Sequence, residues 1–344
     1  MTRKRKIGLS LLAVLVLLVA FNWELVHYGI RQGIGQGKIV WNAVPMDVLL
    51  QDPAYPDSLK QKLLLVKAVR QYAIDSLGLR DTDNYQKVFD QKGQELLWVV
   101  TACEPFRLQP KLWKFPVVGA VPYKGFFEKE KALNERKKWE AEGYDVSIRN
   151  PGGWSTLGWF NDPILSSMLL RREGDLANLI IHEMVHATIW VKDDAEFNEN
   201  LATFIGDTAA YYFLRSRYGL TSEPYQRYVN ENEDYRKFSA HMLRGSVGLD
   251  SLYGSFAEGA PVSEKKQAKE KYIRHIVDAM DTLTLHYPPK SKTRFQKQLP
   301  NNTYFMTFRT YQSKQDTLGR DFAVRFRGDL KAYVADWKAR FGVE

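Results

Sequence analysis

Apolar residues recur at helical spacing in several long stretches of the sequence. Within residues 58–79, leucine, valine and alanine return every three or four positions, and Gly78 is a natural stop for that helix. The segment 126–143 is charged and amphipathic and predicts a helix that ends at its final glycine. The same kind of pattern predicts further helices over residues 225–243, 263–286 and 321–341.

Strand-like patterns are shorter and lie before residue 161. Residues 96–103 form a short apolar run, residues 144–148 alternate, and residues 154–160 read as another extended segment. No internal repeat is present, and no linker rich in proline, glycine or serine follows residue 45. The sequence therefore predicts a mainly helical α+β fold, in which residues 27–344 form a single unit.

The segment 176–191 is apolar on nearly every side, as a buried helix should be. His182 and His186 are four positions apart, so both imidazoles project from one face of that helix. Glu183 completes the pattern H-E-x-x-H, in which two histidines bind zinc and the glutamate acts as general base. The pattern fixes only three positions, and a pair of hydrogen-bonded core histidines is the alternative. The cost of burying these groups without partners favours the metal site.

A catalytic zinc site needs a third protein ligand and keeps one position open for water. Glu199 is the favoured ligand, because apolar residues at helical intervals predict a second helix over residues 197–205. Asp193 and Asp194 are the next candidates, although segment 192–195 reads as the solvated turn between the two helices. Both helices are expected within residues 175–207.

Several separated blocks of sequence accompany these helices. They are Gly35-Gln36-Gly37, Phe115-Pro116-Val117-Val118-Gly119, Pro122-Tyr123-Lys124-Gly125-Phe126-Phe127, Gly143-Tyr144-Asp145-Val146, residues 154–163, Phe197-Asn198-Glu199, and Asn301-Asn302 with Tyr311. The blocks resemble the bacterial putative aminopeptidases, a membrane-associated, gluzincin-like family of zinc metallopeptidases. The resemblance covers most of the chain. It implies a zincin-like core with a small sheet before the metal helix, a helical C-terminal lobe, and zinc-dependent hydrolysis of peptide bonds.

The predicted mechanism uses Zn²⁺ held by His182, His186 and Glu199, with water in the fourth position. Glu183 would take a proton from the water as it attacks a peptide carbonyl, and would pass that proton to the leaving amine. The activity implied by the resemblance is that of an aminopeptidase. The alternative function is a membrane-tethered metal-binding or interaction module without proteolytic activity.

Several supporting roles have more than one candidate. Tyr311 or Tyr211 would stabilise the oxyanion, and Glu104 or Glu128 would hold the α-amine of an exopeptidase substrate. Residues 154–158 are the candidate edge strand for an extended peptide, with an ordinary core strand as the alternative.

The sequence also does not single out one acidic residue that would orient a histidine ligand by a hydrogen bond. In gluzincins this acid stands four residues after the glutamate ligand, where this chain has Thr203, and Asp207 follows one turn later.

The four basic residues at positions 3–6 precede an uncharged apolar run over residues 7–21. Segment 7–26 is therefore predicted to be a membrane anchor or signal segment, with the basic tail 1–6 in the cytoplasm. Its length and the lack of a clear cleavage site favour an uncleaved anchor over cleavage after Ala20. The catalytic body would then lie on the periplasmic side of the inner membrane.

Composition narrows the expected partners. The net charge is +9, but the basic residues are dispersed, and the lysines of residues 264–271 alternate with glutamates on a solvated helix face. No nucleic-acid-binding motif is recognisable, so the expected partners are a peptide substrate and the membrane, not nucleic acid. The single cysteine, Cys103, precludes an intrachain disulfide and reads as a buried structural residue. The substrate sequence, the choice between exo- and endopeptidase action, and the oligomeric state stay open.

Overall fold

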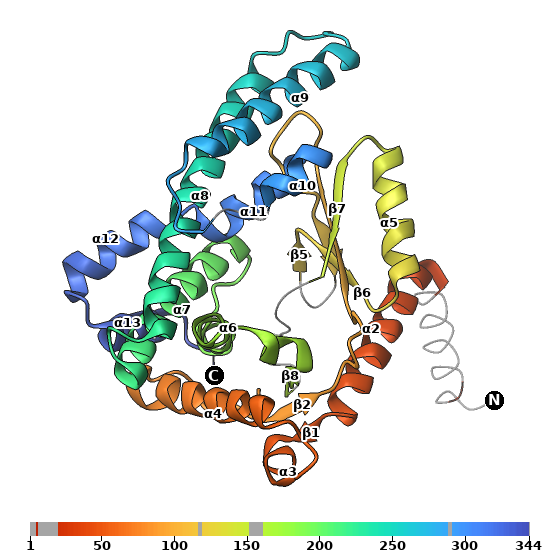
Figure 1. The fold of residues 1–344 in the computed structure, drawn as a ribbon. Helices are drawn as coiled ribbons and strands as arrows, with labels where there is room; N and C mark the ends of the chain where they lie inside the picture. Colours follow the sequence, from red (N-terminus) through yellow and green to blue (C-terminus); the bar gives the residue numbers. More distant parts are fainter. Residues whose placement is uncertain (1–4, 6–19, 116–118, 151–160, 288–290, 344) are drawn as a thin grey trace.

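The computed structural model describes residues 5, 20–115, 119–150, 161–287 and 291–343 (Figure 1). Helices make up most of this part of the chain, and its strands fall into three small sheets. The predicted mainly helical α+β class is therefore confirmed. The shortest helices are α3 (Met46–Gln51), α10 (Ser291–Lys297) and the 3₁₀ helices η1 (Ser166–Leu170) and η2 (Ala279–Thr282).

One antiparallel sheet has the strand order β6-β3-β7. Its central strand β3 (Trp98–Cys103) lies between β6 (Lys124–Phe126) and β7 (Asp145–Arg149). Both strands that the sequence predicted in this region are confirmed. Most positions of β3 are buried, because helices cover the sheet on both sides.

Helix α5 (Lys129–Ala141) packs on this sheet through Ala132 and Trp139. These two side chains share a small core with Val100 and Val146 of the sheet. The helix begins later than residue 126, because the residues just before it pair with β3 as an edge strand instead.

Two smaller sheets complete the β structure. Strands β1 (Val44–Pro45), β2 (Lys87–Phe89) and β8 (Ile164–Leu165) form one, with β2 in the middle. Strands β4 (Trp113–Phe115) and β5 (Gly119–Val121) form an antiparallel pair. Because β8 and η1 lead directly into the metal helix, the sheets precede that helix as expected.

Helix α6 (Glu173–His186), which the sequence predicted as the metal helix, is seen nearly end-on at the centre of Figure 1. It packs between α4 (Asp57–Leu77) and α7 (Ala195–Tyr218) in the largest apolar core. Its buried face consists of side chains that are at most 1% exposed: Leu176, Ala177, Ile180, Ile181, Met184 and Val185. The end of α4 at Gly78, which takes a left-handed φ of 72°, agrees with the sequence prediction.

After β8 the described residues contain helices and connecting segments but no further strand. The long helices α8 (Glu223–Gly254) and α9 (Val262–Asp278) extend together away from the rest of the molecule (Figure 1). Helices α11 (Asn302–Gln312), α12 (Gln315–Phe326) and α13 (Leu330–Phe341) return the chain to the central core.

Some predicted boundaries are wrong. The helix predicted over residues 321–341 is two helices, because Arg327 and Gly328 take left-handed φ angles of 50° and 85°. The helix predicted to reach residue 286 ends at Asp278. The predicted extended segment 154–160, with its candidate edge strand, lies outside the described residues.

The metal helix ends at His186, earlier than the apolar run 176–191 suggested. Ile189 instead forms a β-bridge with Gly342, and the amide of Trp190 donates to the carbonyl of Phe341 at 3.0 Å. The segment after the helix is therefore held against the C-terminal residues.

Near the N-terminus, helix α2 (Trp23–Trp41) packs on the β6-β3-β7 sheet. The hydroxyl of Tyr28 donates to the carbonyl of Gly125 at 2.9 Å. Residues 6–19, which carry most of the predicted membrane segment, lie outside the described residues. Within the part that is described, no helix is both long enough and apolar enough to cross a membrane.

Candidate metal centre

The three predicted ligands converge at the end of α6. The two Nε2 atoms of His182 and His186 lie 3.1 Å apart, and Oε2 of Glu199 lies 3.3 Å from the first and 3.5 Å from the second. Glu199 reaches this point from the second turn of α7. Among the described residues, these three form the group whose positions suit a metal ion.

The triangle of ligand atoms has the size that zinc requires. A tetrahedral ion with bonds of about 2.0–2.1 Å holds its ligands about 3.3–3.4 Å apart. The observed separations of 3.1, 3.3 and 3.5 Å bracket that value. The donor set of two imidazoles and one carboxylate is also that of catalytic zinc sites with one open position. The residues therefore fit zinc in both chemistry and spacing.

The two histidines stabilise the ionised form of the Glu199 carboxyl group. Burial by itself would raise the pKa of Glu199, but His186 and His182 lower it well below its usual range. The carboxyl is therefore ionised at neutral pH, as a metal ligand must be. Its side chain is 21% exposed, and that of His186 only 4%.

A polar group lies behind His182, on the side of α7. A Cβ added to Gly206 would lie 3.4 Å from the Cβ of His182, so the two helices approach closely here. One turn from His182, Asn178 donates to Asp207, and Tyr228 also donates to this carboxylate at 3.3 Å. Burial raises the pKa of Asp207 to about 6, against the effect of Tyr228, His182 and Asn178. Of Thr203 and Asp207, only Asp207 carries a carboxylate, and His182 acts on it electrostatically, so Asp207 is the candidate acid at this histidine.

The segment between α6 and α7 is fixed by its neighbours. Both the amide and the carbonyl of Val191 bind the Asn198 side chain, at 2.8 and 2.7 Å. Asp194 caps α7 by accepting a hydrogen bond from the amide of Phe197 at 2.9 Å. Glu196 pairs with Lys314 at 3.1 Å. Asp193 and Asp194 are exposed and stand outside the ligand triangle, as the sequence predicted for this turn. Glu196 is exposed and outside the triangle as well, and Asp194 and Glu196 each have a structural partner.

A cavity of about 340 Å³ opens beside the metal ligands. This volume is within the range of small-ligand sites, about 300–1,000 Å³. Its walls come from β5, from the segment after α6, from α11 and from the C-terminal residues. Among the lining side chains are His186, Glu199, Tyr123, Arg149 and Tyr311.

Tyr311 and Tyr123 line this cavity together with His186 and Glu199, two of the candidate metal ligands. Burial and the carboxylate of Glu199 raise the pKa of Tyr311 above its usual value, and Arg149 opposes the increase. Tyr123 is 39% exposed, and partial removal of solvent, together with Glu199 and Glu183, raises its pKa to about 12. Both phenols therefore keep their protons at neutral pH and can donate hydrogen bonds.

The other predicted supporting residues lie elsewhere. Tyr211 packs on Tyr228 and does not line the cavity in the part of the chain that is described. Glu128 is paired with Arg31 on α2, and Glu104 stands outside the cavity lining as well. The sequence analysis missed Tyr123 and Arg149 as site residues, although the first lies in a block shared with the resembling family and the second ends a predicted strand.

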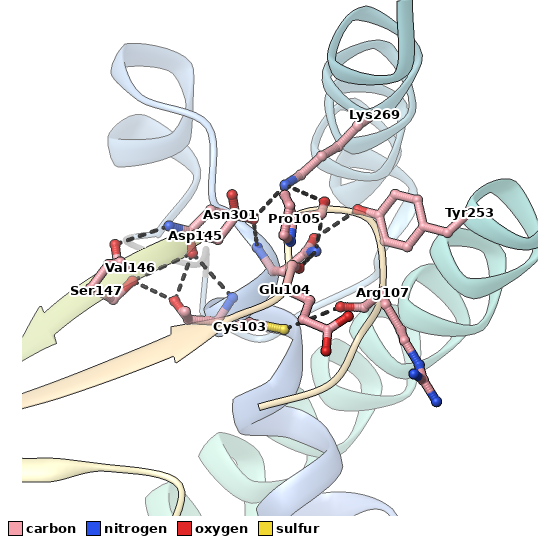
Figure 2. A network of polar contacts seen from close by, with 12 residues as sticks. Cys103, Glu104, Pro105, Arg107, Asp145, Val146, Ser147, Tyr253, Lys269 and Asn301 are labelled. Atoms are coloured by element: carbon pink, nitrogen blue, oxygen red, sulfur yellow. Dashed lines mark hydrogen bonds and ion pairs between the residues drawn. The ribbon is translucent and has the colours of Figure 1, made fainter. Parts of the chain in front are cut away.

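Helix α11, which carries Tyr311, is anchored by a buried polar network (Figure 2). Lys269 of α9 reaches Asp145 at the start of β7 and the carbonyl of Pro105. Asn302 is fully buried; its amide donates to Asp145 at 2.8 Å, and its side chain donates to the carbonyl of Glu104 at 2.8 Å. The network ties the first turn of α11 to the sheet, so it fixes one wall of the cavity.

Cys103 lies at the edge of the same network. Its side chain is 1% exposed, and its thiol donates to the carbonyl of Arg107 at 3.4 Å. Burial raises the pKa of this thiol to about 12. Cys103 is a buried free cysteine, as predicted.

Comparison with known families places the chain. The family described as putative aminopeptidase matches residues 27–341. The chain belongs to this family. No match is found among curated proteins or among solved structures. The aminopeptidase family match starts at residue 27, directly after the segment predicted to enter the membrane, and includes every residue of the ligand triangle.

Proposed function

We propose that this member of the aminopeptidase family is a zinc-dependent peptidase with a zincin-like core. The observation that carries the proposal is the ligand triangle of His182, His186 and Glu199, whose edges of 3.1, 3.3 and 3.5 Å suit tetrahedral zinc. Family membership supports the choice of a peptide as substrate. The cavity beside the ligands supplies a place for it.

The side chains around the triangle have distinct tasks. When bound, zinc would act as a Lewis acid and would lower the pKa of a water molecule, which could then attack the peptide carbonyl. Glu183 accepts the proton that the water loses and delivers it to the nitrogen of the leaving amine. Tyr311 and Tyr123 donate hydrogen bonds to the carbonyl oxygen as it gains negative charge. Asp207 orients the imidazole of His182 from behind.

Metal analysis of matched variants tests the zinc site. The full chain should contain about one zinc ion, measured by mass spectrometry after purification. Glu199→Ala should lower zinc affinity by more than about 100-fold, because losing a group that merely orients a ligand already costs 10–100-fold. Glu196→Ala is the control on the same helix and should bind zinc like the unaltered chain. Loss of zinc in the control, with normal binding in Glu199→Ala, would contradict the assignment.

Cleavage of a mixed peptide library tests the reaction. Glu183→Gln should keep its zinc and its fold but lose turnover by about 100-fold or more, since an amide cannot accept the proton. Unchanged turnover in this variant would remove Glu183 from the mechanism. Zinc binding by the unaltered chain without any peptide cleavage would favour the metal-binding module instead.

A further inference from the structure

We propose that Asp193 binds the protonated α-amine of the peptide substrate and so directs the enzyme to N-terminal residues. This inference rests on the proposed peptidase function and adds the group that recognises the substrate end. A free α-amine has a pKa of about 7.7–8.0 and is mostly protonated at neutral pH. An ionised carboxylate facing the substrate cavity is the side chain that suits it.

Asp193 lies in the same cavity as two of the metal ligands. It lines the cavity together with His186 and Glu199. Its Oδ1 atom is 3.4 Å from the position that a Cβ would take on Gly119, the first residue of β5. The carboxylate is exposed, and it lies beside the strand that forms another cavity wall, where a ligand in the cavity can reach it.

The backbone presents this carboxylate from a fixed position. Two residues before Asp193, Val191 is held at both its amide and its carbonyl by the side chain of Asn198. Directly after it, Asp194 begins the cap of α7. Asp193 itself has a left-handed φ of 60°, which is uncommon for a residue other than glycine. The backbone on both sides of Asp193 is therefore already ordered before a ligand binds, so little backbone freedom is lost on binding.

Of the acidic side chains that line the cavity, Asp193 is the one for which no partner is seen in the described part of the chain. Three acidic residues line the cavity: Asp193, Asp194 and Glu199. Asp194 caps a helix, and Glu199 faces the two histidines. Within the described part of the chain, no hydrogen bond or ion pair engages the side chain of Asp193. The candidates suggested by sequence, Glu104 and Glu128, do not line the cavity there.

Binding of paired inhibitors tests the inference without relying on turnover. Leucine hydroxamate carries a metal-binding group and a free amine, whereas N-acetyl-leucine hydroxamate lacks the charged amine. Calorimetric titration of the zinc-loaded full chain should show about two- to fivefold tighter binding of the free-amine compound, the range expected for one solvent-accessible ion pair. Asp193→Asn should bind both compounds equally, with an unchanged affinity for the acetylated one.

Glu196→Gln is the matched control, because Glu196 is exposed on the next turn and is not part of the cavity lining. It should keep the preference for the free amine. Steady-state cleavage of a tripeptide and its acetylated form should agree: Asp193→Asn raises KM for the free-amine peptide about two- to fivefold and leaves kcat unchanged.

The outcomes separate the two proposals. A preference for the free amine that survives in Asp193→Asn overturns the role of Asp193, and so does a zinc-loaded chain that cleaves acetylated and free peptides equally well. Both results leave the zinc peptidase in place. A chain that binds no zinc and cleaves neither peptide overturns the proposed function, and the amine site fails with it.

Discussion

Tyr311 of α11 lines the same cavity as His186 and Glu199, although its helix is distant from them in sequence. Replacing it with phenylalanine removes a single oxygen atom and keeps the ring. If that oxygen donates to the developing oxyanion, Tyr311→Phe should lower kcat by about 100-fold, with little change in KM and zinc content. Steady-state kinetics on a peptide substrate, with zinc measured in the same preparation, checks this expectation.

Tyr211→Phe serves as the comparison for that variant. Tyr211 was the other tyrosine candidate from the sequence, and it packs on Tyr228 outside the cavity lining. Its kcat should stay within about twofold of the unaltered enzyme. A larger loss of kcat in Tyr211→Phe than in Tyr311→Phe would reverse the assignment of the two residues.

The sequence could predict residues whose partners lie close along the chain. His182 and His186 share a helix face, and Glu199 follows at the next helix, so local periodicity was enough to select the ligands that converge. Arg149 and Tyr123 join the site only through the folding of separate segments around the cavity. No spacing rule connects residues brought together in that way, so the sequence could not select them.

At the scale of elements, Glu135 joins β4, β6 and α5. Its carboxylate accepts hydrogen bonds from the indoles of Trp113 and Trp139, both at 2.9 Å, and pairs with Lys124 at 3.0 Å. Its side chain is 12% exposed. Glu135→Gln removes the charge that these three donors share and should lower the free energy of unfolding by about 2 kcal/mol at pH 7. Denaturant titration of both proteins measures the difference.

The difference in the free energy of unfolding between the unaltered protein and Glu135→Gln should depend on pH, because the carboxyl group of Glu135 titrates. Burial by itself would raise the pKa of Glu135, but Trp139, Trp113 and Lys124 lower it below its usual value. The stabilisation is therefore complete above the unfolded-state pKa, about 4.3, and is lost as pH falls through the lower folded-state pKa. The difference in the free energy of unfolding between the two proteins should therefore become smaller as the pH decreases below about 4. A gap that widens under acid would show that the carboxylate is not preferentially stabilised in its charged form.

Elements with strong local patterns were predicted, and elements fixed by distant contacts were not. Helix α4 has a regular apolar stripe and a glycine stop, and its predicted and observed ends agree closely. The segment after His186 continues the apolar pattern of the preceding helix, but it pairs with residues 341–343 and is extended instead. Helix α11 was missed because its first turn depends on bonds to Asp145 and Glu104, which are far away in sequence.

At the scale of the whole molecule, the site is a meeting point of the sheet region and the helical region. The helices α6 and α7 supply the ligands, and β5, β7 and α11 supply the facing walls. The buried ion pair between Lys269 and Asp145 joins α9 to β7 at this boundary (Figure 2). The long α8–α9 pair is therefore connected to the cavity, although its outer end extends far from α6 (Figure 1).

The orientation of this body relative to the membrane is the remaining prediction at that scale. The basic residues at positions 3–6 precede the apolar run 7–21, so we propose that residues after about 27 lie outside the cytoplasm. Cys103 suits a labelling test, because its burial and its raised thiol pKa, about 12, keep the native background low. A new cysteine at Glu258, which is exposed between α8 and α9, would report on the body. A new cysteine at Thr2 would report on the tail.

A membrane-impermeant maleimide applied to intact spheroplasts should label Glu258→Cys and leave Thr2→Cys unlabelled until the membrane is permeabilised. The unaltered chain, with Cys103 as its sole cysteine, should stay unlabelled in both conditions. The physical reason for the expected asymmetry is that positively charged residues flanking an apolar segment are retained on the cytoplasmic side. Labelling of Thr2→Cys in intact spheroplasts, with Glu258→Cys protected until lysis, would place the peptidase body in the cytoplasm and reverse the proposed topology.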